Sequence, residues 1–176
     1  MIRPAKLVQR FLLPGFVISL IYAFRFHALV SPRAEVELSP LLKLGKGTRI
    51  SSFAKVKATD GPLTIGARVS IGSGCFIHAG SAGVAIGDDS LISPNVSIVG
   101  SNYRYDRLDI PIQQQGQITK GVTIGNDVWI GVGCAILDGA VIGDHAIVAP
   151  NAVVSGHIAE NVIAAGNPAK PIFTRR

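Results

Sequence analysis

The chain has 176 residues, a length typical of one domain, of which 48% are apolar and 16% charged, and it contains only 2 Cys. This composition excludes an intrinsically disordered chain, which would be poor in apolar residues, and a disulfide-rich secreted scaffold. The formal net charge is +6, and basic residues cluster only near residues 3–10 and 170–176, without a basic stripe that interleaves aromatic residues, so we expect no nucleic-acid partner.

The amino-terminal stretch 1–43 contains an apolar segment, residues 11–30. Its uncharged part ends at Arg25 and is too short to cross a bilayer as a helix. We prefer a short helix packed on the end of the domain; the alternative is an interfacial segment that makes a peripheral contact with anionic membrane lipid. No small-x-small cleavage site follows, so we expect no signal peptide and a cytoplasmic protein, either free or on the inner face of the membrane.

A six-residue period organises the chain from residue 44 onward. The lead positions hold only Ile, Leu or Val, and Gly often follows them. These positions are Leu44, Ile50, Val56, Ile65, Ile71, Ile77, Ile86, Ile92, Ile98, Ile124, Ile130, Ile136, Ile142, Val148 and Val154. An amphipathic helix would show a period of 3.6 and an ordinary strand a period of two. A period of six instead predicts a short strand followed by a corner, repeated as an all-β solenoid over residues 44–172.

Three longer spacings locate the loops of this solenoid. The spacing between lead residues is nine at 56–65 and at 77–86, and it is 26 at 98–124. With three hexads to a turn, all three insertions leave the same corner. The period therefore predicts a three-sided solenoid with one long loop, residues 99–121. Residues 173–176 follow the solenoid as a basic tail. We expect the amino-terminal segment and the residues after Val162 to cover the two ends.

The two cysteines occupy the same inward position, two turns apart. Neighbouring turns stack about 4.8 Å apart, so Cys75 and Cys134 would be separated by roughly 10 Å. That separation is too long for a disulfide. We therefore expect both to be inert core residues.

Several repeats resemble those of the hexapeptide-repeat acyltransferases. The similar motifs are IGARVS-IGSGCF, IGDDSL-ISPNVS, IGNDVW-IGVGCA and VIGDHA-IVAPNA-VVSG, together with the closing AGNPAK at 165–170. The resemblance covers residues 44–172 and is strongest for the sugar and polysaccharide O-acetyltransferases. It implies a left-handed parallel β-helix, a homotrimer with active sites between subunits, and acetyl-CoA as the co-substrate.

The resemblance leaves the catalytic base open. Family members usually carry a histidine in the long loop, five residues after the last lead residue, but that position holds Tyr103 here. A neutral tyrosine is a poor base at neutral pH because its ordinary pKa is about 10. His78 lies directly under Val99, where the loop begins, and is our candidate to replace the missing base, with Tyr103 beside it. The alternative is a histidine that is merely packed at a polar corner.

Polar residues at the start of the long loop are candidates for binding the acceptor. Asn102 or Tyr103 could position the acceptor hydroxyl, and Asp106 could hold a sugar hydroxyl or orient a histidine. Arg104 adds positive charge that would suit an anionic acceptor such as a nucleotide- or lipid-diphosphate sugar. A solvated loop without such a role is the alternative.

The resemblance also assigns residues to coenzyme A. Trp129 and Gly131 match positions near the thioester, and a backbone amide near Gly131 could stabilise the oxyanion. The other matched positions are Ala149, Pro150, Ser155 and Gly156 beside the pantetheine arm, and Lys170 near the phosphates. Family members often have Ala-Gly where this chain has Pro and Asn, so one hydrogen bond to pantetheine would be absent.

The leading interpretation is an acetyl-CoA-dependent O-acetyltransferase that acts on a sugar of a polysaccharide or glycolipid precursor, by direct attack in a ternary complex. A non-catalytic trimeric scaffold or ligand-binding protein is the alternative, favoured by Tyr103. A carbonic-anhydrase-like metal site would need three converging histidines. His78, His145 and His157 lie on distant turns, so we expect no metal.

Overall fold

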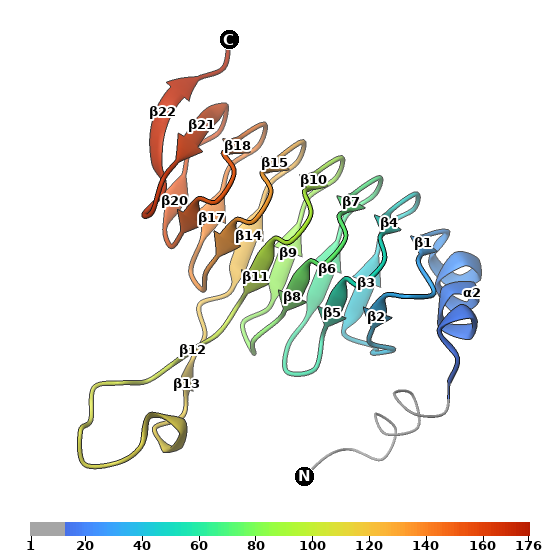
Figure 1. Cartoon of the computed structure of the whole chain (residues 1–176), viewed down its shortest axis with the longest axis horizontal. Helices are drawn as coiled ribbons and strands as arrows, with labels where there is room; N and C mark the ends of the chain where they lie inside the picture. The colour runs from blue at the N-terminus through green and yellow to red at the C-terminus, as the bar shows by residue number, and fades with distance from the viewer. Residues whose placement is uncertain (1–12) are drawn as a thin grey trace.

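The computed structural model describes residues 13–176, which form a solenoid of short strands with one helix at its amino-terminal end (Figure 1). Residues 1–12, which include the first two positions of the apolar segment and three basic residues before it, lie outside the described part of the chain. The strands of the solenoid lie in three sheets, here called A, B and C, which form its three sides. This is the three-sided form that the six-residue period predicts.

Strands that occupy the same side in successive turns pair in parallel, so equivalent residues form columns along the solenoid. Sheet A contains β1 (Leu29–Val30), β4 (Arg49–Ile50), β7 (Ser70–Ile71), β10 (Leu91–Ile92), β15 (Trp129–Ile130), β18 (Ile147–Val148), β21 (Val162–Ala165) and β22 (Lys170–Thr174). Sheet B contains β2 (Glu35–Val36), β5 (Lys55–Lys57), β8 (Phe76–His78), β11 (Ser97–Val99), β16 (Ala135–Ile136) and β19 (Val153–Val154). Sheet C contains β3 (Leu42–Leu44), β6 (Leu63–Ile65), β9 (Val84–Ile86), β14 (Val122–Ile124), β17 (Val141–Ile142) and β20 (His157–Ile158).

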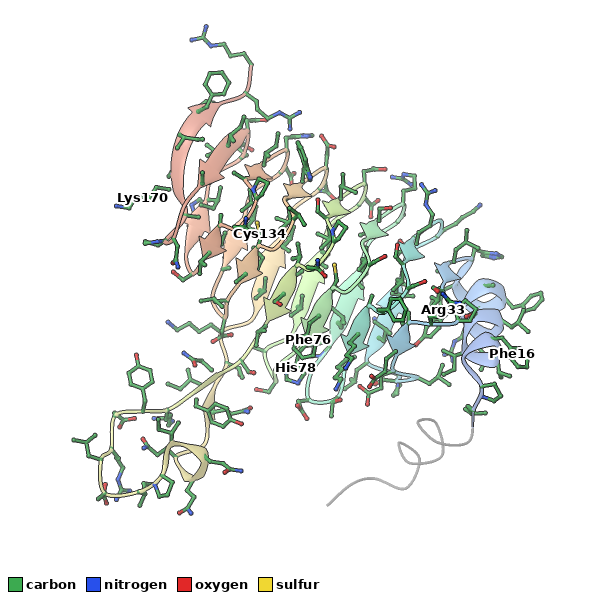
Figure 2. All side chains as sticks on the ribbon, viewed as in Figure 1. Phe16, Arg33, Phe76, His78, Cys134 and Lys170 are labelled. Atoms are coloured by element: carbon green, nitrogen blue, oxygen red, sulfur yellow. The ribbon has the colours of Figure 1, made fainter. Side chains whose placement is uncertain are left out.

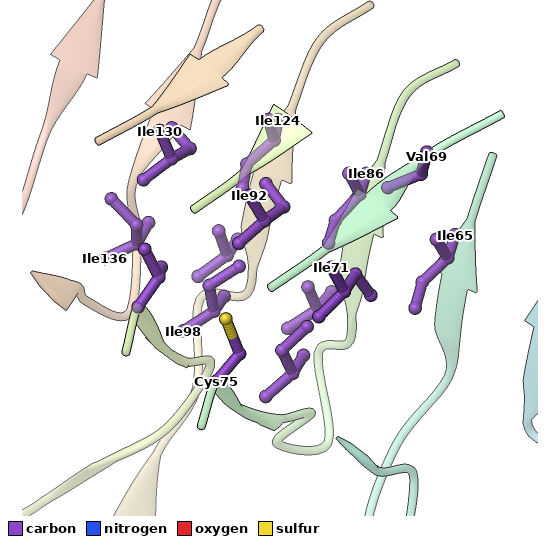
Figure 3. Packing of buried hydrophobic residues seen from close by; sticks show 14 of the residues in the cluster. Ile65, Val69, Ile71, Cys75, Ile86, Ile92, Ile98, Ile124, Ile130 and Ile136 are labelled. Carbon is purple, nitrogen blue, oxygen red and sulfur yellow. The ribbon is translucent and has the colours of Figure 1, made fainter. Parts of the chain in front are cut away.

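Columns of branched aliphatic side chains fill the inside of the solenoid (Figure 3). All fifteen lead residues that the period predicts to point inward are buried, and none is more than 5% exposed. Ile71, Ile92 and Ile130, for example, stack in one column on sheet A. Burial of one such side chain stabilises the fold by roughly 1.5–3 kcal/mol. Because every turn repeats this burial, neighbouring turns hold one another in place.

The first turn of the solenoid begins two strands before residue 44, the predicted start. Strands β1, β2 and β3 form this first turn, with Val30 and Val36 buried inside it. These two residues keep the six-residue spacing, but the next inward lead residue, Leu44, follows eight residues later. The corner between them is lengthened around Ser39, whose hydroxyl accepts a hydrogen bond from the Leu41 N–H at 3.2 Å. Only two regularly spaced lead residues, Val30 and Val36, precede this corner, so the repeat there is too short to show in the sequence, and the pattern did not include β1 and β2.

Both ends of the solenoid are covered. The predicted short helix is present as α2 (Gly15–Phe26), which packs on the first turn through Ile18 and Tyr22. The Tyr22 hydroxyl donates a hydrogen bond to the Glu37 carbonyl at 2.7 Å, and burial raises the pKa of this phenol above its ordinary value. At the other end, β22 pairs antiparallel with β21 and extends through Thr174, into the predicted basic tail, residues 173–176. Over residues 13–176, no helix is long and apolar enough to cross a membrane.

The long loop leaves the corner between sheets B and C, which is the corner that the spacings predict. It forms a hairpin of β12 (Asn102–Tyr103) and β13 (Gln117–Ile118), with a short 3-10 helix, η1 (Ile112–Gln114), between them. The hairpin projects away from the solenoid (Figure 1). Its surface is therefore open to ligands or to another chain.

The two cysteines are free and buried. The thiol of Cys75 donates to the Ser93 carbonyl at 3.1 Å, and that of Cys134 to the Ala149 carbonyl at 3.0 Å. Burial raises the pKa of both thiols, which keeps them protonated and poorly nucleophilic. These surroundings agree with the expected role as core residues.

Candidate functional site

His78 ends strand β8 at the corner from which the long loop leaves. Its register partner in the next turn is Val99, and the Gly100 N–H donates to the His78 carbonyl at 2.9 Å. The ring Nε2 lies 3.3 Å from Asp60 Oδ2, and the histidine side chain is 21% exposed. A carboxylate beside one ring nitrogen orients the ring and leaves the other nitrogen, Nδ1, for a second partner. The structure thus pairs an imidazole with a carboxylate at the base of the loop.

Sequence reasoning did not identify Asp60. This residue lies at the same corner as His78, one turn earlier, within the first nine-residue spacing. The six-residue period does not fix positions inside such an insertion. A signal was nevertheless available, because this insertion and the one after His78 leave the same corner, so their polar residues are neighbours.

Phe76 and Lys57 complete the surroundings of His78. The rings of Phe76 and His78 lie on the same outer face, with centroids 6.3 Å apart and planes inclined by 11°. Lys57 is the register partner of His78 in the preceding turn, and its Nζ lies 5.9 Å from the Phe76 ring centroid. Figure 2 shows Phe76 and His78 beside one another near the base of the hairpin. This face therefore offers an aromatic ring, an imidazole and an ammonium group to a polar ligand.

The predicted acceptor residues are all exposed on the first strand of the hairpin and beyond it. Asn102 Oδ1 accepts a hydrogen bond from the Tyr103 N–H at 3.0 Å, and the Arg104 N–H donates to the Gly116 carbonyl at 3.1 Å. Asp106 is also exposed. Within residues 13–176, no hydrogen bond joins any of these side chains to His78. The structure therefore places Asn102 and Tyr103 near the same corner as His78 without fixing them against it.

The base of the hairpin is anchored to the solenoid by polar contacts. The hydroxyls of Ser81 and Thr119 lie 2.6 Å apart. Asp138 Oδ1 accepts hydrogen bonds from the backbone N–H groups of Lys120 and Gly121, each at 2.8 Å. Together with the bond from Gly100 to His78, these contacts fix where the loop leaves and where it returns.

Trp129 and Gly131 lie on a different part of the surface. Trp129 begins β15 on sheet A, is half exposed, and donates its indole N–H to Ser93 Oγ at 3.0 Å. The Gly131 N–H already donates to the Val148 carbonyl at 2.8 Å, so this amide is not free to bind an oxyanion. The amide of the following residue, Val132, has no acceptor within the described residues. It is therefore the available backbone donor next to Gly131.

The residues assigned to the pantetheine arm and phosphates divide between two corners and the carboxy-terminal strand. Ala149 and Pro150 lie at the corner between sheets A and B, one turn beyond Gly131. Ser155 and Gly156 are exposed at the corner between sheets B and C, and a Cβ on Gly156 would meet no atom within 4 Å. Lys170 is exposed at the start of β22 (Figure 2).

Apart from Ser155, Gly156 and Lys170, the predicted site residues therefore form two groups on one chain. The first, at the corner between sheets B and C, contains His78, its partner Asp60 and the start of the loop. The second, on sheet A and the corner that follows it, contains Trp129 and Gly131. Sheet B lies between the two groups, so one chain does not bring His78 and Trp129 together.

The two other histidines considered for a metal site lie elsewhere on the solenoid. His145 Nδ1 lies 2.9 Å from Asp127 Oδ2 at the corner between sheets C and A, and His157 is exposed on β20. Within residues 13–176, no group of three or more His, Cys, Asp or Glu side chains is arranged to hold a metal ion. The three histidines considered for a metal site thus occupy separate places in the fold.

The repeats match family models and the sequences of known proteins. Residues 121–156 match the family model described as bacterial transferase hexapeptide (six repeats), and residues 62–99 match the hexapeptide repeat of succinyl-transferase. WbbJ of Escherichia coli (strain K12), named for O-acetyl transfer in lipopolysaccharide biosynthesis, is 30% identical over 156 residues, which cover 84% of this chain and 76% of WbbJ. The chain belongs to the hexapeptide-repeat acyltransferase family.

Two further comparisons show how this family member relates to others. A Mycobacterium tuberculosis protein named as an acetyltransferase is 34% identical over 135 residues, which cover 77% of this chain but only 45% of that protein. This chain thus spans less than half the length of that relative. AntD of Bacillus cereus, an N-acyltransferase solved with dTDP and coenzyme A, is 23% identical, superposes with a TM-score of 0.76, and matches 85% of this chain and 82% of its own. At this identity the likeness shows the fold, a left-handed parallel β-helix.

This hexapeptide-repeat acyltransferase departs from the family pattern at the loop. Tyr103 stands where the resemblance implies a histidine, and it is exposed on the hairpin. Of the described histidines, His78 is the one that lies at the base of this loop, and it is oriented by a carboxylate. The geometry therefore provides an imidazole at the base of the loop, on the solenoid and not on the loop itself.

Proposed function

We propose that this protein transfers an acetyl group from acetyl-CoA to a hydroxyl of a sugar in a polysaccharide or glycolipid precursor. Membership of the acyltransferase family supports acyl transfer. A solved form of AntD contains coenzyme A together with the nucleotide sugar dTDP-4-amino-4,6-dideoxyglucose. WbbJ is named for O-acetyl transfer in lipopolysaccharide biosynthesis. These names support a sugar-containing acceptor and a coenzyme A-linked donor. The observation that carries the proposal for this chain is the His78–Asp60 pair at the base of the loop.

His78 acts as a general base in the proposed reaction. With Asp60 accepting a hydrogen bond from Nε2–H, Nδ1 carries the lone pair that removes the proton from the acceptor hydroxyl. The acceptor oxygen attacks the thioester carbon, a C–O bond forms, and the C–S bond breaks as the tetrahedral intermediate collapses. The departing thiolate of coenzyme A takes the proton from His78. No covalent acyl-enzyme forms, and the free imidazole is regenerated.

Two copies of the chain would complete each site. Because His78 and Trp129 lie on different sides of one chain, a homotrimer with facing sides would bring His78 of one copy opposite Trp129 of the next. Exposed apolar side chains on sheet A, including Leu91 beside Trp129, suit such a contact. Coenzyme A would lie between the copies, with the Val132 amide near the thioester oxygen and Lys170 near the phosphates.

An amino sugar is the second candidate acceptor, because AntD is an N-acyltransferase. A hydroxyl depends more strongly on a base than a neutral amine, which is already nucleophilic. The His78–Asp60 pair therefore favours a hydroxyl acceptor. A trimeric scaffold that binds ligand without catalysis is the remaining alternative, and Tyr103 in the loop is the feature that supports it.

The test is thiol release from acetyl-CoA by the purified full chain, with hydroxyl sugars, amino sugars and their nucleotide-linked forms as acceptors. The His78→Ala variant should lower kcat by about 10²–10⁴-fold, which is typical for loss of a general base. The Asp60→Asn variant should lower kcat by less, with KM unchanged, because it disturbs only the orientation of the ring. His157→Ala, which removes an exposed histidine on sheet C, is the matched control and should be as active as the wild type.

The outcomes separate the alternatives. Undiminished turnover in His78→Ala would reject His78 as the general base but would not reject the proposed acetyltransferase activity. Turnover restricted to amino sugars would assign N-acyl transfer. Saturable binding of acetyl-CoA by calorimetry, with no turnover on any acceptor, would favour the scaffold.

A further inference from the structure

The outer face of α2 carries an exposed apolar stripe. Phe16, Leu20 and Phe24 follow one another at four-residue spacing, so they lie on one face of the helix, and they are 58%, 51% and 80% exposed. The opposite face, with Ile18 and Tyr22, is the one that packs on the solenoid. Figure 2 shows Phe16 at the outermost edge of this end of the protein. Grouped exposed aromatic and aliphatic side chains of this size mark a contact surface.

Positive charge is concentrated at the same end of the chain. Residues 1–34 contain five Arg or Lys and no Asp or Glu, whereas the remaining residues contain 12 basic and 11 acidic side chains. Arg25 and Arg33 are exposed on and beside the helix. Lys46 is exposed next to the helix end, where the Gly47 N–H donates to the His27 carbonyl at 2.9 Å. In the described part of the chain, the exposed basic side chains of Arg25, Arg33 and Lys46 therefore lie at the same end as the apolar stripe.

The first carboxylates along the chain, Glu35 and Glu37, do not cancel this charge. Glu35 lies 3.9 Å from the ammonium groups of Lys55 and Lys57 on sheet B. Glu37 Oε2 accepts hydrogen bonds from the Ala58 N–H at 3.1 Å and from a neighbouring threonine hydroxyl at 2.7 Å. Both carboxylates are thus occupied on the side of the solenoid, away from the outer face of the helix.

We propose that α2 docks this end of the protein onto an anionic lipid surface. The helix would lie in the plane of the interface, with Phe16, Leu20 and Phe24 among the acyl chains and the basic side chains at the headgroups. Its 12 residues are too few to cross a bilayer, so the apolar outer face could enter the membrane only at the interface. The helix lies at one extremity of the molecule (Figure 1), so contact there leaves the sheets and the long loop uncovered.

A second copy of the chain is a poorer occupant for this stripe. A symmetric contact would place two identical clusters of positive charge against each other. Three side chains also offer much less than the roughly 800 Å² that each partner usually contributes to a stable interface. An anionic lipid surface would bury the apolar stripe in its acyl chains and attract the basic side chains to its headgroups.

The test is cosedimentation of the full chain with vesicles of phosphatidylcholine alone and of phosphatidylcholine mixed with phosphatidylglycerol. We expect binding to the mixed vesicles only, weakened by added salt. A triple variant, Phe16→Ser, Leu20→Ser and Phe24→Ser, should bind at least about 100-fold more weakly, and Phe24→Ser alone about tenfold. Arg25→Gln should weaken binding by about fivefold.

Matched controls come from the opposite end of the molecule. Ile172→Ser with Phe173→Ser removes apolar side chains of similar exposure, 65% and 61%, and should not change vesicle binding. Arg176→Gln is the control for charge. Unchanged thermal unfolding of each variant shows that the helix face, and not the fold, was altered.

Three results would overturn the proposal. The first is failure of the folded wild type to bind the mixed vesicles, and the second is binding by the triple variant that equals that of the wild type. The third is an oligomer that the triple substitution dissociates while neither protein binds vesicles, which would assign the stripe to a contact with a second copy. Membrane docking is independent of the proposed reaction, because thiol release with a soluble acceptor needs no vesicles. Loss of vesicle binding with full turnover would therefore separate the two.

Discussion

The solenoid and the long loop 100–121 are ordered in opposite ways. In the solenoid, every turn buries branched side chains in columns, and the lead residues are almost fully excluded from solvent. In the loop, none of residues 101–120 is buried, and Leu108 is 101% exposed. Polar contacts order it instead. For example, the side-chain amide Nε2 of Gln115 donates hydrogen bonds to the backbone carbonyls of Arg107 at 2.7 Å and Ile110 at 3.1 Å.

This difference shows how the fold separates stability from specificity. Repeated burial fixes the shape of the solenoid and the corner at which the loop leaves. The loop contributes little to stability, so its side chains are free to suit an acceptor. The base of the loop is where the two regions meet, and His78 lies there on the stable side.

The largest expected difference between the two regions is in stability. Ile98→Ala removes a fully buried side chain and should lower the free energy of unfolding by about 2–5 kcal/mol. Ile112→Ala, the same substitution at a residue that is 55% exposed in the loop, should change it by less than about 0.5 kcal/mol. Urea unfolding measures both. Equal losses would show that the loop is part of the folding unit.

The contact between the corner and the loop base is tested by Gly80→Ala. A Cβ at Gly80 would overlap the Gly100 carbonyl oxygen, so the backbone at the start of the loop must shift, at a cost of about 1–3 kcal/mol. Gly156→Ala, at the same corner but in open space, should be nearly neutral. Thermal unfolding compares the two. If Gly80→Ala were as stable as Gly156→Ala, the close approach of the two backbones would be wrong.

The returning end of the loop is tested by Asp138→Ala. Removal of this carboxylate leaves the Lys120 and Gly121 N–H groups without their acceptor and should cost about 1–2 kcal/mol. Hydrogen exchange should accelerate at these two amides and in the hairpin, while the core strands stay protected. Asp106→Ala, an exposed carboxylate within the hairpin, should leave the exchange pattern unchanged. Acceleration throughout the solenoid would contradict the separation of the two regions.

The smallest expected effect is a pH dependence that both regions share. Arg68 holds the pKa of Asp89 on the solenoid below its ordinary value, and Arg107 does the same for Asp109 in the loop. Both carboxyls are charged above the ordinary pKa of Asp, so each pair stabilises the folded protein there and loses this contribution as the pH falls through the lowered pKa. In an NMR titration, Arg68→Gln should raise the midpoint of Asp89 and leave that of Asp109 unchanged. Movement of both midpoints would mean that the shifts do not arise from the paired arginines.

The sequence predicted the solenoid because one physical requirement repeats in every turn. An inward branched residue is needed at every sixth position, so the period identifies the columns, the three sides and the corner of the long loop. The first two strands were missed because only Val30 and Val36 keep the spacing before the corner at Ser39. Two residues six positions apart are too few to show a period, although both are buried as the period requires.

The site was only partly predictable, for a different reason. The register placed His78 under Val99, which the structure confirms, because both belong to the repeating part of the chain. Asp60 and the hairpin lie in insertions, whose course depends on individual polar contacts. The hydrogen bonding of the Gly131 backbone N–H could not be predicted either, because only the paired turns of the structure show that it already donates to the Val148 carbonyl.

The stacking of turns also gives the protein a built-in length scale. The helix α2 rests on the first turn, and His78 lies two turns further along, which is about 10 Å at the usual spacing between strands. Insertion of one complete turn between them would move the histidine a further 4.8 Å or so from the helix and leave its corner intact. Among related proteins, the number of turns between the end helix and the histidine would therefore set the distance from the helix to the acceptor site.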